Sequence, residues 1–259
     1  MKKEIGLELL DRQVRKANVL IQNSRFNLTT QQQKIILYLI SQIQPWDEEF
    51  KTYELDALEF ARVCGLEFKG GKDYTEIKEQ IHKIADKSMW LLIEDGDSEV
   101  LIRWIENPVI RKKSGTISLT LNRHLKPYLL QLKERYTEYQ LIYTLHFKSK
   151  YSIKLYELIC SIHFHDLQSY KKRFTVDKLK KILGCESYKD YRDFRKRILD
   201  KSIEEINMYS DKTVTYEPIT VGRKVVEIEL TITTKDIIDR LKIDMEIEKE
   251  LGLTPGQKN

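Results

Sequence analysis

Apolar side chains recur at helical spacing in two segments that can be aligned on one another. Residues 28–43 and 147–162 share their apolar positions. The matching pairs are Leu39 and Leu158, Ile40 and Ile159, and Ile43 and Ile162. This spacing predicts an amphipathic helix in each half. Thr29 or Thr30 is predicted to cap the first helix and Ser149 the second, because short hydroxyl side chains accept from free amides at a helix start.

A second pair of segments follows in the same order. Residues 53–65 and 174–184 each combine a short β-like run with a helical pattern that ends near glycine. Glycine suits the left-handed residue that ends a helix, and aspartate suits the residue that starts one. The predicted caps are Asp56 and Gly65 in the first half and Asp177 and Gly184 in the second. Each half therefore contains a predicted strand followed by a capped helix.

A third helix and a set of strands complete each half. The helices are predicted over Asp73–Trp90 and Tyr188–Tyr209, and Asp73–Ile81 and Asp190–Ile198 share their apolar spacing. Alternating β-branched segments follow. They are Met89–Glu94, Val100–Ile110 and Thr116–Leu121 in the first half, and Val214–Ile219 and Val225–Ile232, joined by a turn at Gly222, in the second.

The repeated order is helix, short strand, helix, turn, helix and two-stranded hairpin. This is the order of a winged helix, so the sequence predicts an α+β fold of two tandem winged-helix domains related by internal duplication. The predicted domains are 1–143, 144–235 and a C-terminal tail, 236–259. Near the N-terminus, apolar residues at three-four spacing predict one more helix that packs on the first domain or on a second chain. They are Leu7, Leu10, Val14, Ala17 and Ile21.

The positive charge is concentrated in the second predicted domain. The 259-residue chain has a net charge of +5, and residues 144–235 hold 19 basic against 13 acidic residues. Residues 1–143 are nearly balanced, with 22 basic against 21 acidic, and the tail is acidic. A local positive field attracts polyanions. The alternative interpretation is a solvated surface that has no partner. The charge indicates where to look for a nucleic-acid interface.

In a helix-turn-helix, the second helix lies in the major groove and its N-terminal half contacts base edges. The helix predicted over Tyr188–Tyr209 has an apolar side, with Tyr191, Phe194, Ile198 and Ile206. Basic residues lie largely off that side and are the candidate base contacts: Lys189, Arg192, Arg195, Lys196 and Arg197. At the hairpin tip, Arg223 and Lys224 are candidates for contacts with the adjacent backbone or the minor groove. The candidates for phosphate contacts are Lys171, Lys172 and Arg173, before the short strand.

The first domain is more mixed in charge. Lys69, Lys72 and Lys78 are candidates for phosphate contacts, with less capacity for base recognition. An equally good interpretation makes this domain a dimerisation or partner module.

Enzymatic chemistry is not expected. No phosphate-binding loop is present, because Gly70-Gly71-Lys72 lacks the remainder of that motif. Cys160 with His163 and His165 lacks a fourth metal ligand at suitable spacing, so we expect neither a metal nor a cofactor. The His163-Phe164-His165 run also has the form found in rolling-circle nucleases, with Tyr188 or Tyr191 as the attacking residue, but it directly follows a strongly helical segment.

Three scattered cysteines, Cys64, Cys160 and Cys185, are typical of reduced thiols in a cytosol. The N-terminus lacks the pattern of a secretory signal, and no apolar run is long enough to cross a bilayer. We therefore expect a cytoplasmic protein without a membrane partner.

Several of these blocks resemble the iteron-binding plasmid replication initiators. The similar blocks are Asn18–Ile21, Leu28–Ile40, Lys150–Leu158, Phe194–Ile198, Ile203–Asn207, Val214–Glu217 and Gly222–Lys224. The resemblance implies that monomers bind direct repeats, called iterons, at a plasmid origin and recruit the host initiator and helicase. It also implies that dimers, joined through the first domain, bind an operator inverted repeat and repress the initiator's own gene. A winged-helix transcriptional repressor without a role in replication is the alternative that shares the fold.

Overall fold

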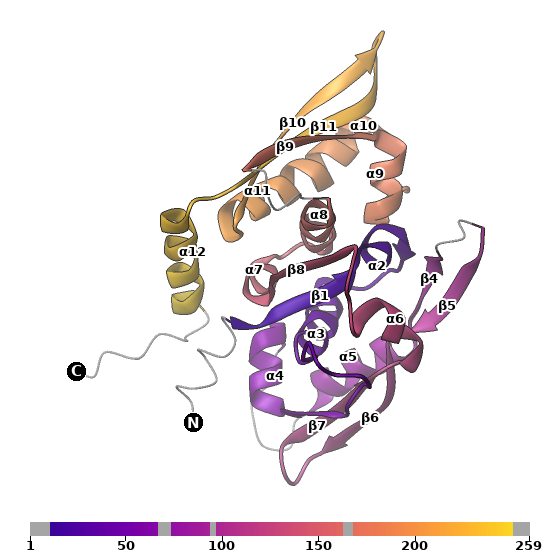
Figure 1. Cartoon of the computed structure of the whole chain (residues 1–259), viewed down its shortest axis with the longest axis vertical. Coiled ribbons are helices and arrows are strands. Elements are labelled where there is room, and N and C mark those ends of the chain that lie inside the picture. Colours follow the sequence, from indigo (N-terminus) through magenta and orange to yellow (C-terminus); the bar gives the residue numbers. More distant parts are fainter. Residues whose placement is uncertain (1–10, 67–73, 94–96, 163–167, 251–259) are drawn as a thin grey trace. The chain divides into compact units, whose positions relative to one another are not determined.

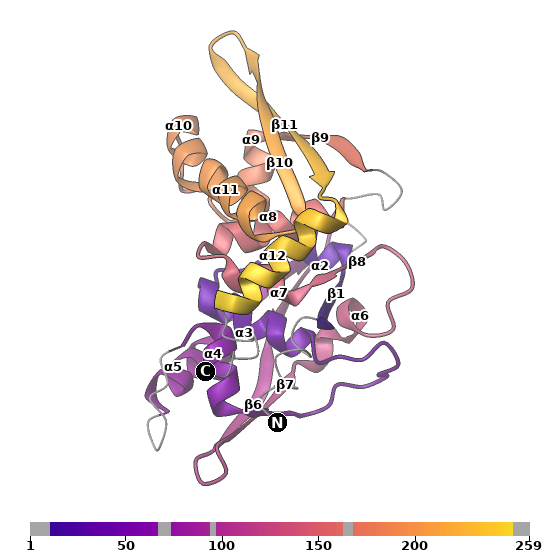
Figure 2. The ribbon, with the colours of Figure 1, turned by 90° about the vertical axis from the view of Figure 1, so that its left-hand side faces the viewer.

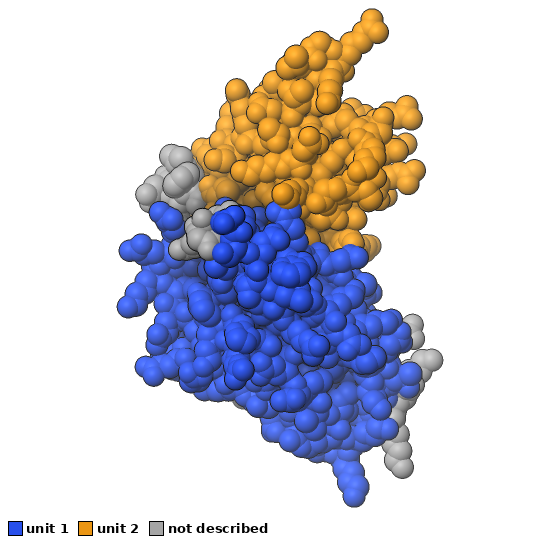
Figure 3. Space-filling view, turned by 90° about the vertical axis from the view of Figure 1, so that its right-hand side faces the viewer, with its two compact units in different colours: residues 1–145 blue, residues 146–259 orange. Residues whose placement is uncertain are grey.

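A computed structural model describes residues 11–66, 74–93, 97–162 and 168–250, and the chain divides into two compact units. The units are Met1–Leu145 and His146–Asn259 (Figure 3). Each unit has a buried core of aliphatic and aromatic side chains. In the described part of the chain, no helix has both the length and the apolar composition that a membrane span requires.

The second unit has the element order of a winged helix (Figure 1). Its elements are α8 (Lys150–Ser161), β9 (Ser169–Thr175), α9 (Val176–Leu183), α10 (Tyr191–Phe194), η2 (Arg195–Leu199), α11 (Asp200–Tyr209), β10 (Lys212–Val221), β11 (Lys224–Thr234) and α12 (Ile237–Glu250). The last of these, α12, occupies most of the predicted tail.

Capping groups define the ends of the helices in this unit. Ser149 caps α8 as predicted, with its hydroxyl accepting from the amide of Tyr151 at 3.2 Å. Gly184 ends α9 in the left-handed conformation, at φ +71°, also as predicted. The N-cap predicted at Asp177 is wrong: Thr175 caps α9 and accepts from the amide of Lys178, while Asp177 lies in the first turn. The strand β9 extends to Thr175, which leaves Thr175 in the extended conformation that an N-cap requires.

The sheet of the second unit has the strand order β10-β11-β9, and all its pairs are antiparallel. Ile228, Leu230 and Ile232 alternate along β11 and are completely buried, so one face of the sheet covers the helices. The hairpin turns at Gly222, where φ is +59°, and its far end extends beyond the other elements of the unit (Figure 2).

The first unit repeats this order with additional strands (Figure 1). Its elements are β1 (Gln13–Ala17), α2 (Asn18–Asn23), β2 (Ser24–Arg25), α3 (Thr30–Ile40), β3 (Tyr53–Asp56), α4 (Ala57–Cys64), α5 (Thr75–Ala85), β4 (Ser88–Leu92), β5 (Glu99–Arg103), β6 (Ile105–Arg111), β7 (Thr116–Leu121), η1 (Arg123–Leu125), α6 (Lys126–Leu129), β8 (Tyr136–Gln140) and α7 (Leu141–His146). Thr29 caps α3 in a reciprocal capping box with Gln32.

Two predicted elements of the first unit differ from the structure. The helix predicted to reach Trp90 ends at Ala85, because burial changes from helical spacing to the alternation of Met89 and Leu91 in β4. The predicted strand Val100–Ile110 is two strands that belong to different sheets: β5 pairs with β4, and β6 pairs with β7. Trp104 lies at the break and is buried, with its ring packed edge-on against Phe26 at 5.2 Å.

The helix predicted near the N-terminus is confirmed only at Ile21, which lies in α2, and is wrong at Val14 and Ala17. Val14 and Ala17 lie in β1, which pairs antiparallel with β8, and both are buried. Leu7 and Leu10 lie outside the described residues. The partner strand comes from Tyr136–Gln140, far along the chain, so local spacing carries no sign of it.

Asn207 connects the last turn of α11 to the first part of β10. Its amide nitrogen donates to the carbonyl of Val214 at 2.9 Å, and its amide oxygen accepts from the Val214 amide at 2.6 Å. Val214 is 1% exposed, so these backbone groups have little access to water. The Asn207 side chain therefore substitutes for a neighbouring strand at this point.

We expect Asn207→Ala to reduce the protection of β10 amides in hydrogen exchange, because both Val214 backbone groups lose their partner. The cost is about 1–3 kcal/mol for a buried group left without a hydrogen bond. Asn207→Asp keeps the acceptor and is the control, which should lose less. Unchanged exchange in β10 of Asn207→Ala would show that the side chain does not support the strand.

Candidate nucleic-acid interface

The helix with the most basic residues begins later than predicted. α10, η2 and α11 follow one another without a break from Tyr191 to Tyr209. Asp190 is the N-cap, and its carboxylate accepts from the amides of Arg192 and Asp193 at 2.6 and 3.3 Å. The start predicted at Tyr188 is wrong by three residues, because the Asp190 cap leaves Tyr188 and Lys189 in the preceding turn.

The inward face of this helix matches the predicted apolar side. Phe194, Ile198 and Ile206 are 2% exposed or less, whereas Tyr191 is only half-buried. The ring of Tyr191 packs against Phe194 with centroids 6.5 Å apart. Burial of this face determines which side chains of the helix point away from the core.

The turn before the helix is held by Lys180, a residue that the sequence analysis did not single out. Lys180 is 6% exposed, its ammonium group donates to the carbonyl of Lys189 at 3.2 Å, and it lies over the ring of Phe194 at 5.4 Å. This cation connects α9 to the start of α10. Its position beside the apolar Leu179 and Leu183 in the helical pattern is the only local signal for its burial.

The outward face of the helix carries cations that have a carboxylate beside them and cations that have none. Arg195 lies 3.8 Å from Asp200, and Arg197 lies 3.8 Å from Asp193, so both have a carboxylate beside them. Arg192 and Lys196 are exposed one turn apart, and among the described residues neither has a side-chain hydrogen bond or ion pair. These two side chains have free positive charge on one face.

The hairpin tip adds two more exposed cations. Val221 and Lys224 close the hairpin as a pair, which leaves Gly222 and Arg223 as the two-residue turn. Arg223 and Lys224 are both exposed, as their predicted role requires.

The three basic residues predicted before the short strand lie within β9 instead, since β9 begins at Ser169. Lys171 and Arg173 bind the same carboxylate, that of Glu229 on β11, at 3.0 and 2.5 Å. The bond from Arg173, followed by that from Lys171, lowers the pKa of Glu229. Lys172 is exposed between them. Two of the three cations therefore already have an anionic partner, which weakens their attraction for phosphate.

In the first unit, Lys78 is exposed on α5, whereas Lys69 and Lys72 lie outside the described residues. The β6–β7 hairpin carries Lys112 and Lys113 in its turn, and both are exposed. Arg111 beside them is held by Glu54 at 3.2 Å and by Ser118. The sequence analysis missed this tip, although basic residues beside a turn glycine are also the signal at Gly222, and φ of Gly115 is +71°.

Of the residues considered for metal or nuclease chemistry, Cys160, Tyr188 and Tyr191 lie in the described part of the chain. His163 and His165 lie outside it. Burial raises the pKa of the Cys160 thiol and of the Tyr191 hydroxyl, which disfavours their nucleophilic forms. Within the described ranges, no three His, Cys, Asp or Glu side chains are grouped as metal ligands would be.

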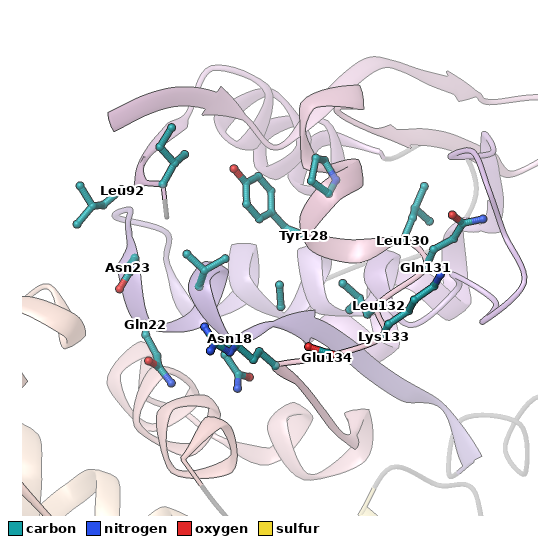
Figure 4. Close-up of a pocket in the computed structure, with 15 residues that line it drawn as sticks. Asn18, Gln22, Asn23, Leu92, Tyr128, Leu130, Gln131, Leu132, Lys133 and Glu134 are labelled. Atoms are coloured by element: carbon teal, nitrogen blue, oxygen red, sulfur yellow. The ribbon is translucent and has the colours of Figure 1, made fainter. Parts of the chain in front are cut away.

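The first unit also contains a groove of about 990 Å³ beside β1 and α6 (Figure 4). Tyr128, Leu130 and Leu132 supply much of its apolar lining, while Asn18 and Gln131 supply amide groups. Lys133, Glu134 and Arg135 supply charged groups to the same lining.

Two family models match the chain. The model of "Initiator Replication protein, WH1" matches residues 13–160, and that of "Initiator Rep protein, WH2" matches residues 175–232. A curated replication initiation protein of Escherichia coli is 23% identical over 204 residues. The match covers 73% of this chain and 60% of that relative, so the chain spans less than two thirds of the relative's length.

A solved structure supports the same architecture. The crystal structure of Pi initiator protein in complex with iteron DNA matches with a TM-score of 0.71 at 19% sequence identity. The match covers 88% of this chain and 99% of that chain. At this identity the likeness concerns the fold, and with the family models it confirms the prediction of two tandem winged-helix domains.

We expect Asp190→Ala to loosen the first turn of α10, because the amides of Arg192 and Asp193 lose their acceptor. A lost N-cap costs about 0.5–2 kcal/mol of helix stability, and Asn caps as well as Asp. Hydrogen exchange over residues 191–195 should therefore accelerate in Asp190→Ala and stay near wild type in Asp190→Asn. Equal exchange in both variants would exclude a capping role for Asp190.

Proposed function

The chain belongs to the family of initiator replication proteins with two winged-helix domains, and on this premise we propose that it initiates replication of a bacterial plasmid by binding direct repeats at the plasmid origin. The observation that carries the proposal is the free positive charge of Arg192 and Lys196 on the exposed face of the helix at 191–209. In winged-helix and related proteins, this helix enters the major groove.

The second unit is assigned the main sequence-specific contacts. Arg192, Arg195 and Lys196 lie near the N-terminal end of the helix, which is the part that meets base edges. Arginine can contact guanine O6 and N7 with two hydrogen bonds. Arg223 and Lys224, at the end of the extended hairpin, are assigned to the neighbouring backbone or minor groove, and Lys172 to phosphate.

The first unit is assigned auxiliary phosphate contacts. Its β6–β7 hairpin presents Lys112 and Lys113 much as the hairpin of the second unit presents Arg223 and Lys224. Lys78 on α5 is the other exposed candidate, and Lys69 and Lys72 complete the predicted set. Cations at these places position a protein on DNA without reading its sequence.

In this scheme, the monomer binds the origin and initiates replication by recruiting the host initiator and helicase. These steps take place in the bacterial cytoplasm. The comparison with an iteron complex supports direct repeats as the target. Host factors come from the family resemblance. We infer no catalytic step for the chain itself.

A dimer that represses the initiator's own gene at an inverted repeat is supported by the outer face of the β2-β4-β5 sheet. Trp90 and Leu101 face each other across β4 and β5, and they are 49% and 53% exposed. β5 is an edge strand of this sheet. An open strand edge beside exposed aromatic and aliphatic side chains is suited to pairing with a second copy.

The initiator proposal is tested by footprinting the purified protein on DNA upstream of its own gene, with a salt titration. We expect protection of regularly spaced direct repeats and a steep loss of affinity with salt. Arg192→Ala and Lys196→Ala should each weaken binding about fivefold to a hundredfold, the range for a lost base contact. Lys242→Ala, on α12, removes an equal charge and should bind as wild type.

Two results would contradict this proposal. Protection of a single inverted repeat, without direct repeats nearby, would make the chain a plain repressor. Strand cleavage that depends on Mg²⁺ or Mn²⁺ and disappears in His163→Ala and His165→Ala would make it a nuclease.

Dimerisation is tested by sedimentation of Trp90→Ser and Leu101→Ser. Each should raise the dimer dissociation constant at least about tenfold, because aromatic and apolar anchors dominate such interfaces. Trp46→Ser is the matched control, since Trp46 is 74% exposed but outside this sheet. Both sheet variants should keep their affinity for direct repeats. A dimer that survives both changes would place the interface elsewhere.

A further inference from the structure

A π turn in the exposed helix brings Arg195 and Asp200 together. In η2 the backbone amide of Asp200 donates to the carbonyl of Arg195, five residues earlier. In a regular α-helix, side chains five residues apart diverge by about 140°. The wider π turn reduces this divergence, and the Arg195 Nε atom lies 3.8 Å from a carboxylate oxygen of Asp200. Such turns are uncommon and frequently lie at functional sites.

The second carboxylate oxygen of Asp200 is held from the hairpin. Tyr216 on β10 donates its hydroxyl to Asp200 Oδ1 at 2.6 Å. Tyr216 pairs with Leu230 of β11 in the sheet, so its backbone is fixed by the ladder. Burial, followed by the bond to Asp200, raises the pKa of Tyr216, so the hydroxyl keeps its proton at neutral pH. Asp200 is thus held between the hairpin and Arg195.

We propose that Asp200 and Tyr216 are positioning residues that direct the Arg195 guanidinium toward one base pair of the target. The proposal rests on the proposed function, and it names a determinant of specificity within the same interface. The Asp200 carboxylate, 3.8 Å from Arg195 Nε, attracts the guanidinium toward one side, which favours a two-bond contact with guanine through its remaining donors. The Asp200 charge also offsets one cation on this face, which weakens attraction to DNA of unrelated sequence.

The second ion pair on this helix, between Arg197 and Asp193, differs in its connection to the hairpin. Arg197 and Asp193 are four residues apart, with side chains 66% and 52% exposed. Among the described residues, no side chain of the hairpin bonds to Asp193, and its pairing with Arg197 follows ordinary helical spacing. Arg195 and Asp200 lie at the same separation and are 49% and 45% exposed, so the bond from the Tyr216 hydroxyl to Asp200 is what distinguishes the two pairs. Asp193→Asn therefore removes the same charge as Asp200→Asn without disturbing a held arginine.

The test measures affinity for one direct repeat, for a set of repeats that each carry one changed base pair, and for unrelated DNA. Tyr216→Phe keeps the ring and the net charge and removes only the hydroxyl. We expect it to lose about fivefold to tenfold of discrimination at one base pair and to keep discrimination at the others. Asp200→Asn should lose the same discrimination and also bind unrelated DNA more tightly. Asp193→Asn should bind all DNAs more tightly and discriminate as wild type.

A double-mutant cycle shows whether Asp200 acts through Arg195. In an Arg195→Ala background, Asp200→Asn should have no further effect on discrimination, whereas a purely structural role of Asp200 would persist. If Tyr216→Phe and Asp200→Asn both discriminate between base pairs as well as wild type does, this inference is wrong and the proposed function still stands. A wild-type protein without preference for direct repeats overturns both.

Discussion

Burial of one face of the helix at 191–209 is the interaction on which the second unit depends. Phe194, Ile198 and Ile206 are almost completely removed from water, and each such side chain contributes about 1.5–3 kcal/mol. This burial fixes the rotation of the helix about its axis. Because the apolar side is held inward, Arg192 and Lys196 have to face solvent. The position of the candidate interface is therefore a consequence of core packing.

The cations of the second unit differ in whether another group of the protein already binds them. Lys180 is buried and holds the turn before the helix, and Lys171 and Arg173 share the carboxylate of Glu229. Arg195 is paired through the π turn. A positive net charge attracts DNA as a whole, but the number of cations free to replace counterions determines the salt dependence of binding. This number is smaller than the count of basic residues suggests.

The two units share an element order, but the surfaces that they expose differ. Each has a hairpin whose tip carries lysine or arginine, so the general attraction for a phosphate backbone is common to both. The first unit adds the β2-β4-β5 sheet with Trp90 and Leu101 on its outer face, and the described residues of the second unit form no corresponding sheet. This addition is consistent with a division of labour in which one unit recognises sequence and the other contacts a second copy.

The sequence by itself determined the helix at 150–161 with its Ser149 cap, the end of α9 at Gly184, the hairpin at Gly222 and the apolar side of the helix at 191–209. These features depend on neighbours within one or two turns, so local spacing and capping chemistry contain them. Only the tertiary structure decided that Val14 lies in a strand, that residues 99–111 belong to two sheets, and that Asp200 meets both Arg195 and Tyr216. Each of these depends on a partner strand or an irregular turn, which local periodicity does not record.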